Sequence, residues 1–171
     1  MMTLVLGANG SGKSAYAEKL ICGAGGARFY IATMIPHGAE GALRVEKHLR
    51  QREGMGFTTL ELPYEVGNAD IPLGAAVLLE DVSNLLGNVL FERGGTPDTV
   101  LKDIDALSNR CGSFVAVTIS GLDATAYENE TRDYIEALNA LNAALFNMVD
   151  TVVEMQAGLA QLKKGGQHAL S

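Results

Sequence analysis

The sequence predicts an α/β protein with a mainly parallel sheet flanked by helices, and three observations support this prediction. Short runs rich in apolar and β-branched residues alternate with longer segments of helical pattern. A glycine-rich turn stands between the first such run and the first helical segment. The 171 residues, 47% hydrophobic and 19% charged, suit one domain with one substantial core. We therefore expect a single domain over residues 1–164 and a flexible tail over residues 165–171, in which His168 has no role.

The candidate strands are six short runs, bounded by turn residues or by helical pattern. They cover residues 2–6, 28–32, 57–62, 75–79, 113–118 and 151–155. Five segments of helical pattern lie between them, at residues 11–21, 39–52, 83–91, 97–108 and 127–146. Such alternation is typical of parallel strands joined by helical crossovers.

Several helix boundaries have an identifiable cause in the sequence. Gly23 follows a run of good helix formers and is a natural end for the first helix. Thr96 followed by Pro97 is typical of an N-cap with proline in the first helical position. In the last helix, residues recur at spacings of four and three and form one stripe along the helix. We expect this stripe to pack on the sheet or, alternatively, to form a subunit contact. Its members are Tyr127, Thr131, Tyr134, Leu138, Leu141 and Leu145.

The glycine-rich turn fits the pattern G-x-x-x-x-G-K-[ST] of a phosphate-binding loop. In such a loop the backbone N–H groups point inward, the lysine (Lys13) lies near the outer phosphates and the serine hydroxyl (Ser14) can hold Mg²⁺. Its position after a strand and before a helix favours this interpretation over a glycine-rich turn with an incidental lysine. We expect a P-loop NTPase-like fold that binds a nucleoside triphosphate through Gly7, Ala8, Asn9, Gly10, Ser11, Gly12, Lys13 and Ser14.

A phosphate-binding loop needs an acidic partner to orient the metal, usually at the end of a neighbouring buried strand. Glu80 and Asp81 follow the apolar run at residues 75–79. Consecutive side chains of an extended segment point to opposite faces, so only one of the two can face the loop. We expect this to be Glu80, as a nucleotide and metal ligand, with Asp81 as the N-cap of the next helix. The alternative is that both carboxylates cap the helix or contact solvent.

One predicted helix is locally basic in a chain whose net charge is −7. Arg44, His48 and Arg52 follow an i, i+4, i+8 spacing and share one face, whereas Val45 and Leu49, together with Ala42, form another. A cationic stripe with one imidazole suits a polyphosphate. A charged helix face that is simply solvated is the alternative, and the helix pattern alone favours it.

Charge, cysteine content and hydropathy limit the class of protein. The net charge of −7 argues against a general affinity for nucleic acid. Cys22 and Cys111 lack the spacing of a disulfide framework or a zinc site. The N-terminus has no basic flank typical of a signal peptide, and no apolar run is long enough for a membrane span. We expect a soluble protein of the reducing cytoplasm.

The order of these motifs resembles a known enzyme family. After the loop come Tyr30-Ile31-Ala32-Thr33, Arg44-x-x-x-His48-x-x-x-Arg52, Phe57-x-Thr59-x-Glu61, Leu78-Leu79-Glu80 and Asn88-Val89-Leu90-Phe91. From Met2 to about Lys164 the chain is similar to the bifunctional adenosylcobinamide kinase / adenosylcobinamide-phosphate guanylyltransferases of cobalamin biosynthesis. Each short motif alone is weak evidence for the family, but the order and spacing of the motifs together are specific to it.

The resemblance implies two reactions. In this family a nucleoside triphosphate, ATP or GTP, phosphorylates a hydroxyl of adenosylcobinamide, and GMP then passes from GTP through a guanylylated histidine. It implies that His48 is the nucleophile, that Lys13 balances charge during transfer, and that Arg44 and Arg52 hold the triphosphate. Glu61 and Glu80 match acidic positions that serve the nucleotide or the metal. It also implies Mg²⁺, a corrinoid substrate and a homotrimer, whereas His37 has no family counterpart and is expected at the surface.

The chain also departs from the family pattern. Gly10 and Phe57 replace an arginine and a tryptophan, and the family's Thr-Asn-Glu-Val-Gly stretch is replaced by Thr118-Ile119-Ser120-Gly121-Leu122-Asp123. Of a later Asn-Gln pair only Asn142 is kept. Loops of this kind line sites without setting the fold. Two alternatives therefore stay open: a P-loop kinase for another small substrate, and a non-catalytic relative that binds nucleotide or corrinoid.

Overall fold

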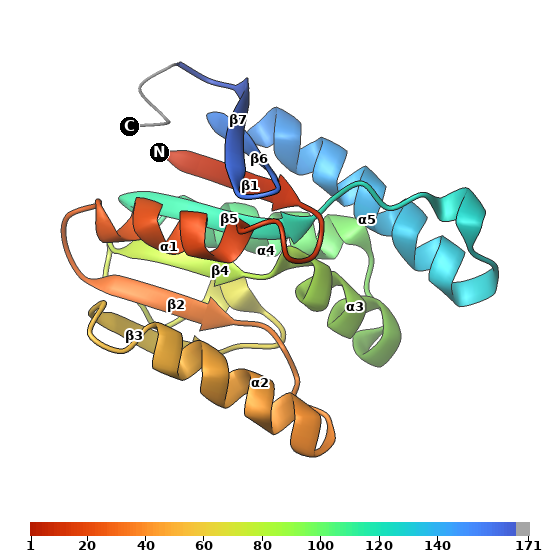
Figure 1. Ribbon diagram of the computed structural model, residues 1–171, viewed down its shortest axis with the longest axis horizontal. Helices are drawn as coiled ribbons and strands as arrows, with labels where there is room; N and C mark the ends of the chain where they lie inside the picture. The colour runs from red at the N-terminus through yellow and green to blue at the C-terminus, as the bar shows by residue number, and fades with distance from the viewer. Residues whose placement is uncertain (167–171) are drawn as a thin grey trace.

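β1 (Met2–Gly7) lies inside a seven-stranded sheet of order β3-β2-β4-β5-β1-β6-β7 in the computed structural model, which describes residues 1–166 (Figure 1). Neighbouring strands are parallel except for β6 and β7, which are antiparallel. The other strands are β2 (Arg28–Ala32), β3 (Phe57–Glu61), β4 (Ala76–Glu80), β5 (Ser113–Ile119), β6 (Thr151–Gln156) and β7 (Leu159–Lys164). The predicted α/β class with a mainly parallel sheet is therefore confirmed, and all six predicted strands are present.

β7, which forms a hairpin with β6, is not among the strands that the sequence predicts. Ala157 and Gly158 join the two strands, and their φ values of 47° and 82° are both positive, as a type I′ turn requires. An Asn-Gly or Asp-Gly pair would have signalled this turn, but Ala-Gly does not. β7 is an edge strand with exposed and half-buried side chains in alternation, so it lacks the apolar run by which the other strands were recognised.

The five predicted helices are also present. They are α1 (Lys13–Cys22), α2 (Gly38–Gln51), α3 (Val82–Arg93), α4 (Pro97–Ser108) and α5 (Asn129–Met148), with short 3₁₀ turns η1 (Val66–Asn68) and η2 (Ala124–Ala126). Thr96 caps α4 in a capping box with Pro97 in its first turn, as predicted. Gly23 ends α1 as expected, and His37 is exposed at the start of α2. No helix within residues 1–166 combines the length and apolar character that a membrane span needs.

Two apolar clusters lie on the two faces of the sheet because consecutive strand residues point to opposite sides. On one face α1 packs through Ala17 and Ile21 against Val5 and Val117. On the other face α3, α4 and α5 bury a larger cluster, to which Leu86, Ile104 and Leu138 contribute (Figure 1). The helices are therefore divided between the faces, and the carboxyl ends of the parallel strands meet at one edge of the sheet.

The stripe predicted on α5 is correct from Tyr134 onward: Tyr134 is partly buried against the core, and its hydroxyl donates to the Ser83 carbonyl at 2.8 Å. Leu138, Leu141 and Leu145 are buried, together with Ile135, which the prediction omitted. Tyr127 precedes the helix and is 46% exposed, and Thr131 is exposed in the first turn. The first turn of α5 extends beyond the sheet, so its residues have no surface on which to pack (Figure 1). Most of the expected tail, residues 167–171, lies outside the described residues.

α2 differs from the other helices because none of its residues is buried. It runs along β2 and β3 at the edge of the sheet (Figure 1). Leu43 is 65% exposed and Leu49 45% exposed on this helix. A helix with so little buried apolar area is held weakly, since burial supplies most of the stability of a helix in a protein.

Candidate phosphate-transfer site

The loop between β1 and α1 has the geometry of a phosphate cradle. Gly12, with φ 90° and ψ 9°, stands in the left-handed region and starts α1 at Lys13. The Lys13 side chain turns back across the loop and its Nζ donates a hydrogen bond to the Ala8 carbonyl at 3.1 Å. Helix and strand thus hold a short turn whose backbone N–H groups stand at the positive end of the helix dipole.

Two neighbouring segments fix this loop from either side. The Ser120 N–H donates to the Gly7 carbonyl at 3.2 Å, and the Gly158 N–H of the β6–β7 hairpin donates to the Ser11 carbonyl at 3.0 Å. A Cβ at Gly7 would stand 2.7 Å from the Met155 carbonyl oxygen, so only glycine fits there. The hairpin that the sequence analysis missed is therefore part of the loop's support.

Glu80 lies at the end of β4, with its carboxylate against the loop. Its Oε1 accepts a hydrogen bond from the Ser14 hydroxyl, and its Oε2 is buried without a hydrogen-bond partner among the described residues. Burial raises the pKa of Glu80 to about 7, and the neighbouring Asp81 adds to this effect, whereas the hydrogen bond from Ser14 opposes it. The structure thus brings together a hydroxyl and a carboxylate that stand 66 positions apart in the chain.

Asp81 has the capping position that the sequence predicted for it. Its Oδ1 accepts hydrogen bonds from the Asn84 N–H and the Ser83 hydroxyl, each at 2.6 Å, at the start of α3. Burial raises the pKa of this carboxyl, while the bond from Ser83 lowers it. The expected division is observed: Glu80 faces the loop and Asp81 caps the helix.

A pocket of about 80 Å³ separates α2 from the sheet and contains four of the predicted site residues. His48 and Arg52 come from α2 and its C-cap, Glu61 from the end of β3 and Glu80 from the end of β4. Arg44 does not line this pocket and is exposed. The other lining residues are Tyr30, Ala32, Met34, Pro36, Val45, Leu49, Thr59 and Asn84. Of these, Tyr30, Ala32 and Thr59 were signalled only as parts of the family resemblance, and Val45 and Leu49 only as parts of a helix face.

The helix faces predicted for α2 were wrong in one respect. Val45 and Leu49 were assigned to a face apart from His48 and Arg52, but all four line the same pocket. Positions 45, 48, 49 and 52 follow the i, i+3, i+4, i+7 spacing that defines one side of a helix. The i, i+4, i+8 stripe, in contrast, rotates away from this side, which leaves Arg44 in solvent.

His48 is half-buried, and its environment favours the neutral imidazole. Burial lowers the pKa of His48, and the positive charges of Arg52, Lys47 and Arg44 lower it further, while Asp81 acts in the opposite direction. A neutral imidazole is the nucleophilic form of this side chain.

Arg52 is a buried cation with incomplete hydrogen bonding. It is 6% exposed, and its Cζ stands 3.4 Å from the centroid of the Tyr30 ring. Its Nε and Nη1 are buried and have no hydrogen-bond partner among the described residues. Its charge lowers the pKa of the buried Glu18, which burial itself raises. Such a guanidinium retains donors for an anion that enters the pocket.

Asn88 of α3 connects the loops that follow β2 and β3. Its Nδ2 donates hydrogen bonds to the Thr33 carbonyl at 2.8 Å and to the Pro63 carbonyl at 3.1 Å. Thr33 in turn exchanges hydrogen bonds of 2.8 Å with the backbone of Asp81 through its hydroxyl. These bonds fix the ends of three neighbouring strands beside the pocket that contains His48.

Comparison with known sequences identifies the chain. The profile of the family described as cobinamide kinase / cobinamide phosphate guanyltransferase matches residues 3–162. The chain belongs to this family. It is 38% identical over 109 residues to the bifunctional adenosylcobalamin biosynthesis protein CobU of Escherichia coli (strain K12), a match over 63% of this chain and 60% of that protein. It is 27% identical over 173 residues to the bifunctional adenosylcobalamin biosynthesis protein CobP of Pseudomonas aeruginosa (strain PAO1), over 96% of this chain and 98% of that protein.

Solved structures agree with the fold. The flagellar accessory protein FlaH from Methanocaldococcus jannaschii is similar with a TM-score of 0.56 and 9% sequence identity, over 99% of this chain and 80% of that one. An ATPase from the type III secretion system of pathogenic bacteria is similar with a TM-score of 0.52 and 14% identity, over 99% of this chain and 60% of that one. At these identities the likeness concerns the fold alone, and it confirms the predicted P-loop NTPase-like fold.

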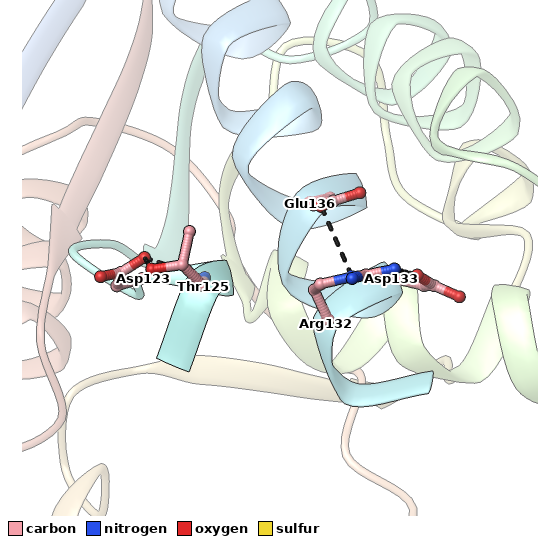
Figure 2. A network of polar contacts seen from close by, with 5 residues as sticks. All are labelled: Asp123, Thr125, Arg132, Asp133 and Glu136. Carbon is pink, nitrogen blue, oxygen red and sulfur yellow. Dashed lines mark hydrogen bonds and ion pairs between the residues drawn. The ribbon is translucent and has the colours of Figure 1, made fainter. Parts of the chain in front are cut away.

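The loop after β5, where this family member departs from the family pattern, is stabilised locally. Asp123 Oδ1 accepts hydrogen bonds from the Thr125 N–H at 2.9 Å and from its hydroxyl at 2.7 Å (Figure 2). These bonds lower the pKa of Asp123. Arg132, on the first turns of α5, lies 3.8 Å from both Asp133 and Glu136 and contacts its own helix (Figure 2). The polar residues of this segment therefore cap and stabilise their own turns.

The base of this loop is joined to α5 by the one asparagine that the chain keeps from the family pair. Thr118 Oγ1 donates to Asn142 Oδ1 at 2.8 Å, and Asn142 Nδ2 donates to the Ile119 carbonyl at 2.9 Å. Asn142 thus fixes the end of β5, from which Ser120 reaches the phosphate loop.

Proposed function

We propose that the protein phosphorylates adenosylcobinamide with ATP or GTP and transfers GMP from GTP to the resulting phosphate ester through His48. The observation that carries this proposal is that Glu80 belongs to both parts of the site. Its carboxylate accepts from Ser14 of the phosphate loop and also lines the pocket of His48. A cradle for a polyphosphate and a half-buried imidazole therefore share one carboxylate.

In the kinase reaction the substrate hydroxyl oxygen attacks the γ-phosphorus of the triphosphate. The new P–O bond forms as the bond to the β-phosphate oxygen breaks, the nucleoside diphosphate leaves with the electron pair, and the hydroxyl proton passes to solvent. The backbone N–H groups of the loop and the Lys13 ammonium stabilise the charge on the phosphate oxygens. Lys13 is 8% exposed, so its charge acts where water screens it little.

The residues beside the loop fit a magnesium ion. Glu80 Oε2 is a buried carboxylate oxygen without a partner among the described residues, and the Ser14 hydroxyl lies next to the same carboxylate. Oxygen ligands of this kind are those that Mg²⁺ prefers, together with phosphate oxygens and water. When bound, the ion would supply positive charge to the phosphates.

In the guanylyl transfer a ring nitrogen of neutral His48 attacks the α-phosphorus of GTP, and pyrophosphate leaves with the electron pair of the broken P–O bond. A phosphate oxygen of the corrinoid ester then attacks the same phosphorus, and the N–P bond returns its electron pair to the imidazole. The unpartnered donors of Arg52 would hold the phosphate beside this nitrogen. Arg44 is exposed and contributes, on this proposal, through its charge alone.

The pocket of His48 must widen before a nucleoside can enter it. Its volume of about 80 Å³ is below the range of roughly 300–1,000 Å³ that is usual for ligand pockets. Because α2 has no buried residue, movement of this helix would sacrifice little packing.

Incubation with α-³²P-labelled GTP and Mg²⁺ tests the proposal directly. We expect an acid-labile adduct that is absent in His48→Ala and present in the matched variant His37→Ala, which alters an exposed histidine. ATP with adenosylcobinamide should yield the phosphate ester, and Lys13→Ala should abolish it. Formation of the adduct without the ester would indicate that only the transferase activity is present. Formation of the ester without an adduct would indicate a kinase alone. Nucleotide binding without either product would support the non-catalytic alternative.

The homotrimer that the family resemblance implies and the cytoplasmic location expected from the composition of the chain are part of this proposal. Light scattering coupled to size-exclusion chromatography measures the oligomeric state, and a monomer at micromolar concentration would contradict that part.

A further inference from the structure

The proposed function requires two different positions of a triphosphate relative to the protein. Phosphoryl transfer occurs at the γ-phosphorus and guanylyl transfer at the α-phosphorus, so the nucleoside lies at different distances from the reacting atom in the two reactions. In the arrangement seen here the pocket of His48 is too small for a nucleoside. A nucleoside whose phosphates occupy the loop therefore needs another place to bind.

A second pocket adjoins the loop directly, on the side of the β6–β7 hairpin. Its volume is about 410 Å³, within the usual range for ligand pockets. It is lined by residues 8–11 of the loop, by Ser120 and Gly121 after β5, and by residues 154–157 of the hairpin. We call it the hairpin pocket. Its walls are the two segments that fix the loop through Ser120 and Gly158.

The hairpin pocket extends from the end of β5 past β1 to β6, so Glu154 stands at the end of the pocket that is farther from Glu80. In the sheet β1 stands between β5 and β6, and β4 is the neighbour of β5. Glu80 on β4 and Glu154 on β6 are thus three strand spacings apart, which is about 14 Å. The Lys13 and Ser14 end of a phosphate loop receives the outer phosphates and the metal. A triphosphate with its γ-phosphate near Glu80 therefore extends its nucleoside toward β6.

The lining offers groups that suit a nucleobase and a ribose. Glu154 Oε2 accepts from Lys163 at 2.9 Å and from Gln156 Nε2 at 3.1 Å, so the carboxylate is held in place on the hairpin. A fixed carboxylate accepts hydrogen bonds from the ring or exocyclic N–H groups of a purine. The Ser11 hydroxyl is buried at the pocket and has no hydrogen-bond partner among residues 1–166. It is a free donor and acceptor at the boundary between loop and hairpin.

We propose that the hairpin pocket binds the nucleoside of the triphosphate whose γ-phosphate is transferred, with Glu154 and Ser120 in contact with it. The inference rests on the proposed function, and it assigns the two reactions to two nucleoside positions on either side of one phosphate loop. Guanylylation of His48 then uses the other side, toward Glu80 and Glu61.

Two variants and one control test this inference. Ser120→Leu fills the pocket without altering the backbone hydrogen bond to Gly7, and Glu154→Gln removes the carboxylate but keeps its shape. Leu159→Ala is the control, because Leu159 is 70% exposed on the same hairpin and does not line the pocket. The measurements are the dissociation constants of MgATP and of magnesium tripolyphosphate by titration calorimetry, and the rate of GMP adduct formation at His48.

We expect Ser120→Leu and Glu154→Gln to weaken MgATP binding about tenfold, because contacts to the nucleoside are lost. Tripolyphosphate binding and the adduct rate should stay at the wild-type values, and the control should match the wild type throughout. Wild-type affinity for MgATP in both variants overturns the inference, and so does a parallel loss of MgATP and tripolyphosphate, which indicates a distorted loop. Wild-type protein that binds MgATP no more tightly than tripolyphosphate also overturns it. Failure of the proposed function differs from all of these, since it appears as absent products.

Discussion

Replacement of Arg52 by methionine should separate stability from activity. The guanidinium is 6% exposed and stacks on Tyr30, and two of its nitrogen atoms have no hydrogen-bond partner among the described residues. Methionine has a similar length and no donors, so it can fill the same space without unmet hydrogen bonds. If the donors of Arg52 are kept for a phosphate, the protein is less stable with arginine than with methionine.

The size of the effect follows from these contacts. Two buried donor nitrogens without partners cost about 2 kcal/mol each, or about 4 kcal/mol together. Loss of the stacking on Tyr30 removes about 2 kcal/mol. The difference is a gain of about 2 kcal/mol in the free energy of unfolding, which raises the Tm by about 4–8 °C for a chain of this length. Arg52 also attracts the Glu18 carboxylate, and this attraction is lost with methionine. Measuring arginine and methionine at position 52 in proteins that both carry Glu18→Gln removes this attraction from the difference in stability.

Thermal unfolding followed by circular dichroism measures the stability, and the labelled-GTP assay measures the adduct at His48. We expect the Tm to rise and the adduct rate to fall about a hundredfold, as for loss of a group that stabilises transferring phosphate. Arg50→Met is the matched control, because the Arg50 side chain is 75% exposed and pairs with Glu46 four positions earlier. A lower Tm in Arg52→Met, or an unchanged adduct rate, would refute the reasoning.

Three further predictions concern the same site. Burial and the cations around His48 lower its pKa, so Lys47→Gln should raise this pKa and move the acid-side fall of the adduct rate to higher pH. Gly7→Ala should lose about 1–3 kcal/mol of stability and triphosphate affinity, since its Cβ meets backbone, whereas Gly25→Ala meets no atom within 4 Å and stands at no positive φ. Asn88→Ala should lower the free energy of unfolding by about 2–4 kcal/mol, because two carbonyls lose their donor.

Each of these predictions has a measurement that can contradict it. An acid-side midpoint of the adduct rate that is the same in Lys47→Gln and in the wild type would show that this charge does not act on His48 as described. Urea unfolding curves that coincide for Gly7→Ala and Gly25→Ala would show that the contact with the hairpin is absent. Wild-type stability in Asn88→Ala would mean that the carbonyls of Thr33 and Pro63 do not depend on this amide.

The strands and helices could be predicted because their signals are local. Apolar runs, the Thr96-Pro97 cap and the glycine-rich turn each act over a few residues, and their observed bounds differ from the predicted ones by no more than two positions. The phosphate loop is the clearest case, since glycine at positive φ and a following helix are properties of the segment itself. β7 was missed because an edge strand is defined by its partner, and its own side chains carry no apolar run.

The candidate site was predicted in its residue types and only partly in its arrangement. The sequence placed Glu80 toward the loop and Asp81 at the helix cap because alternation along an extended chain allows only one carboxylate on each face. It could not tell that Arg52 would be buried on Tyr30 or that Arg44 would stay in solvent. Burial of a helical side chain depends on the surface opposite, and the spacing of charges along α2 contains no information about that surface.

The sequence by itself determined the phosphate loop, the alternation of strands and helices, and the residues capable of transfer chemistry, because backbone preferences and side-chain chemistry belong to single segments. Only the tertiary structure decided that Ser14 meets Glu80, that Glu80 and His48 share a pocket, and that the β6–β7 hairpin borders the loop. These are contacts between segments far apart in the chain, and they arise from the packing of the whole sheet.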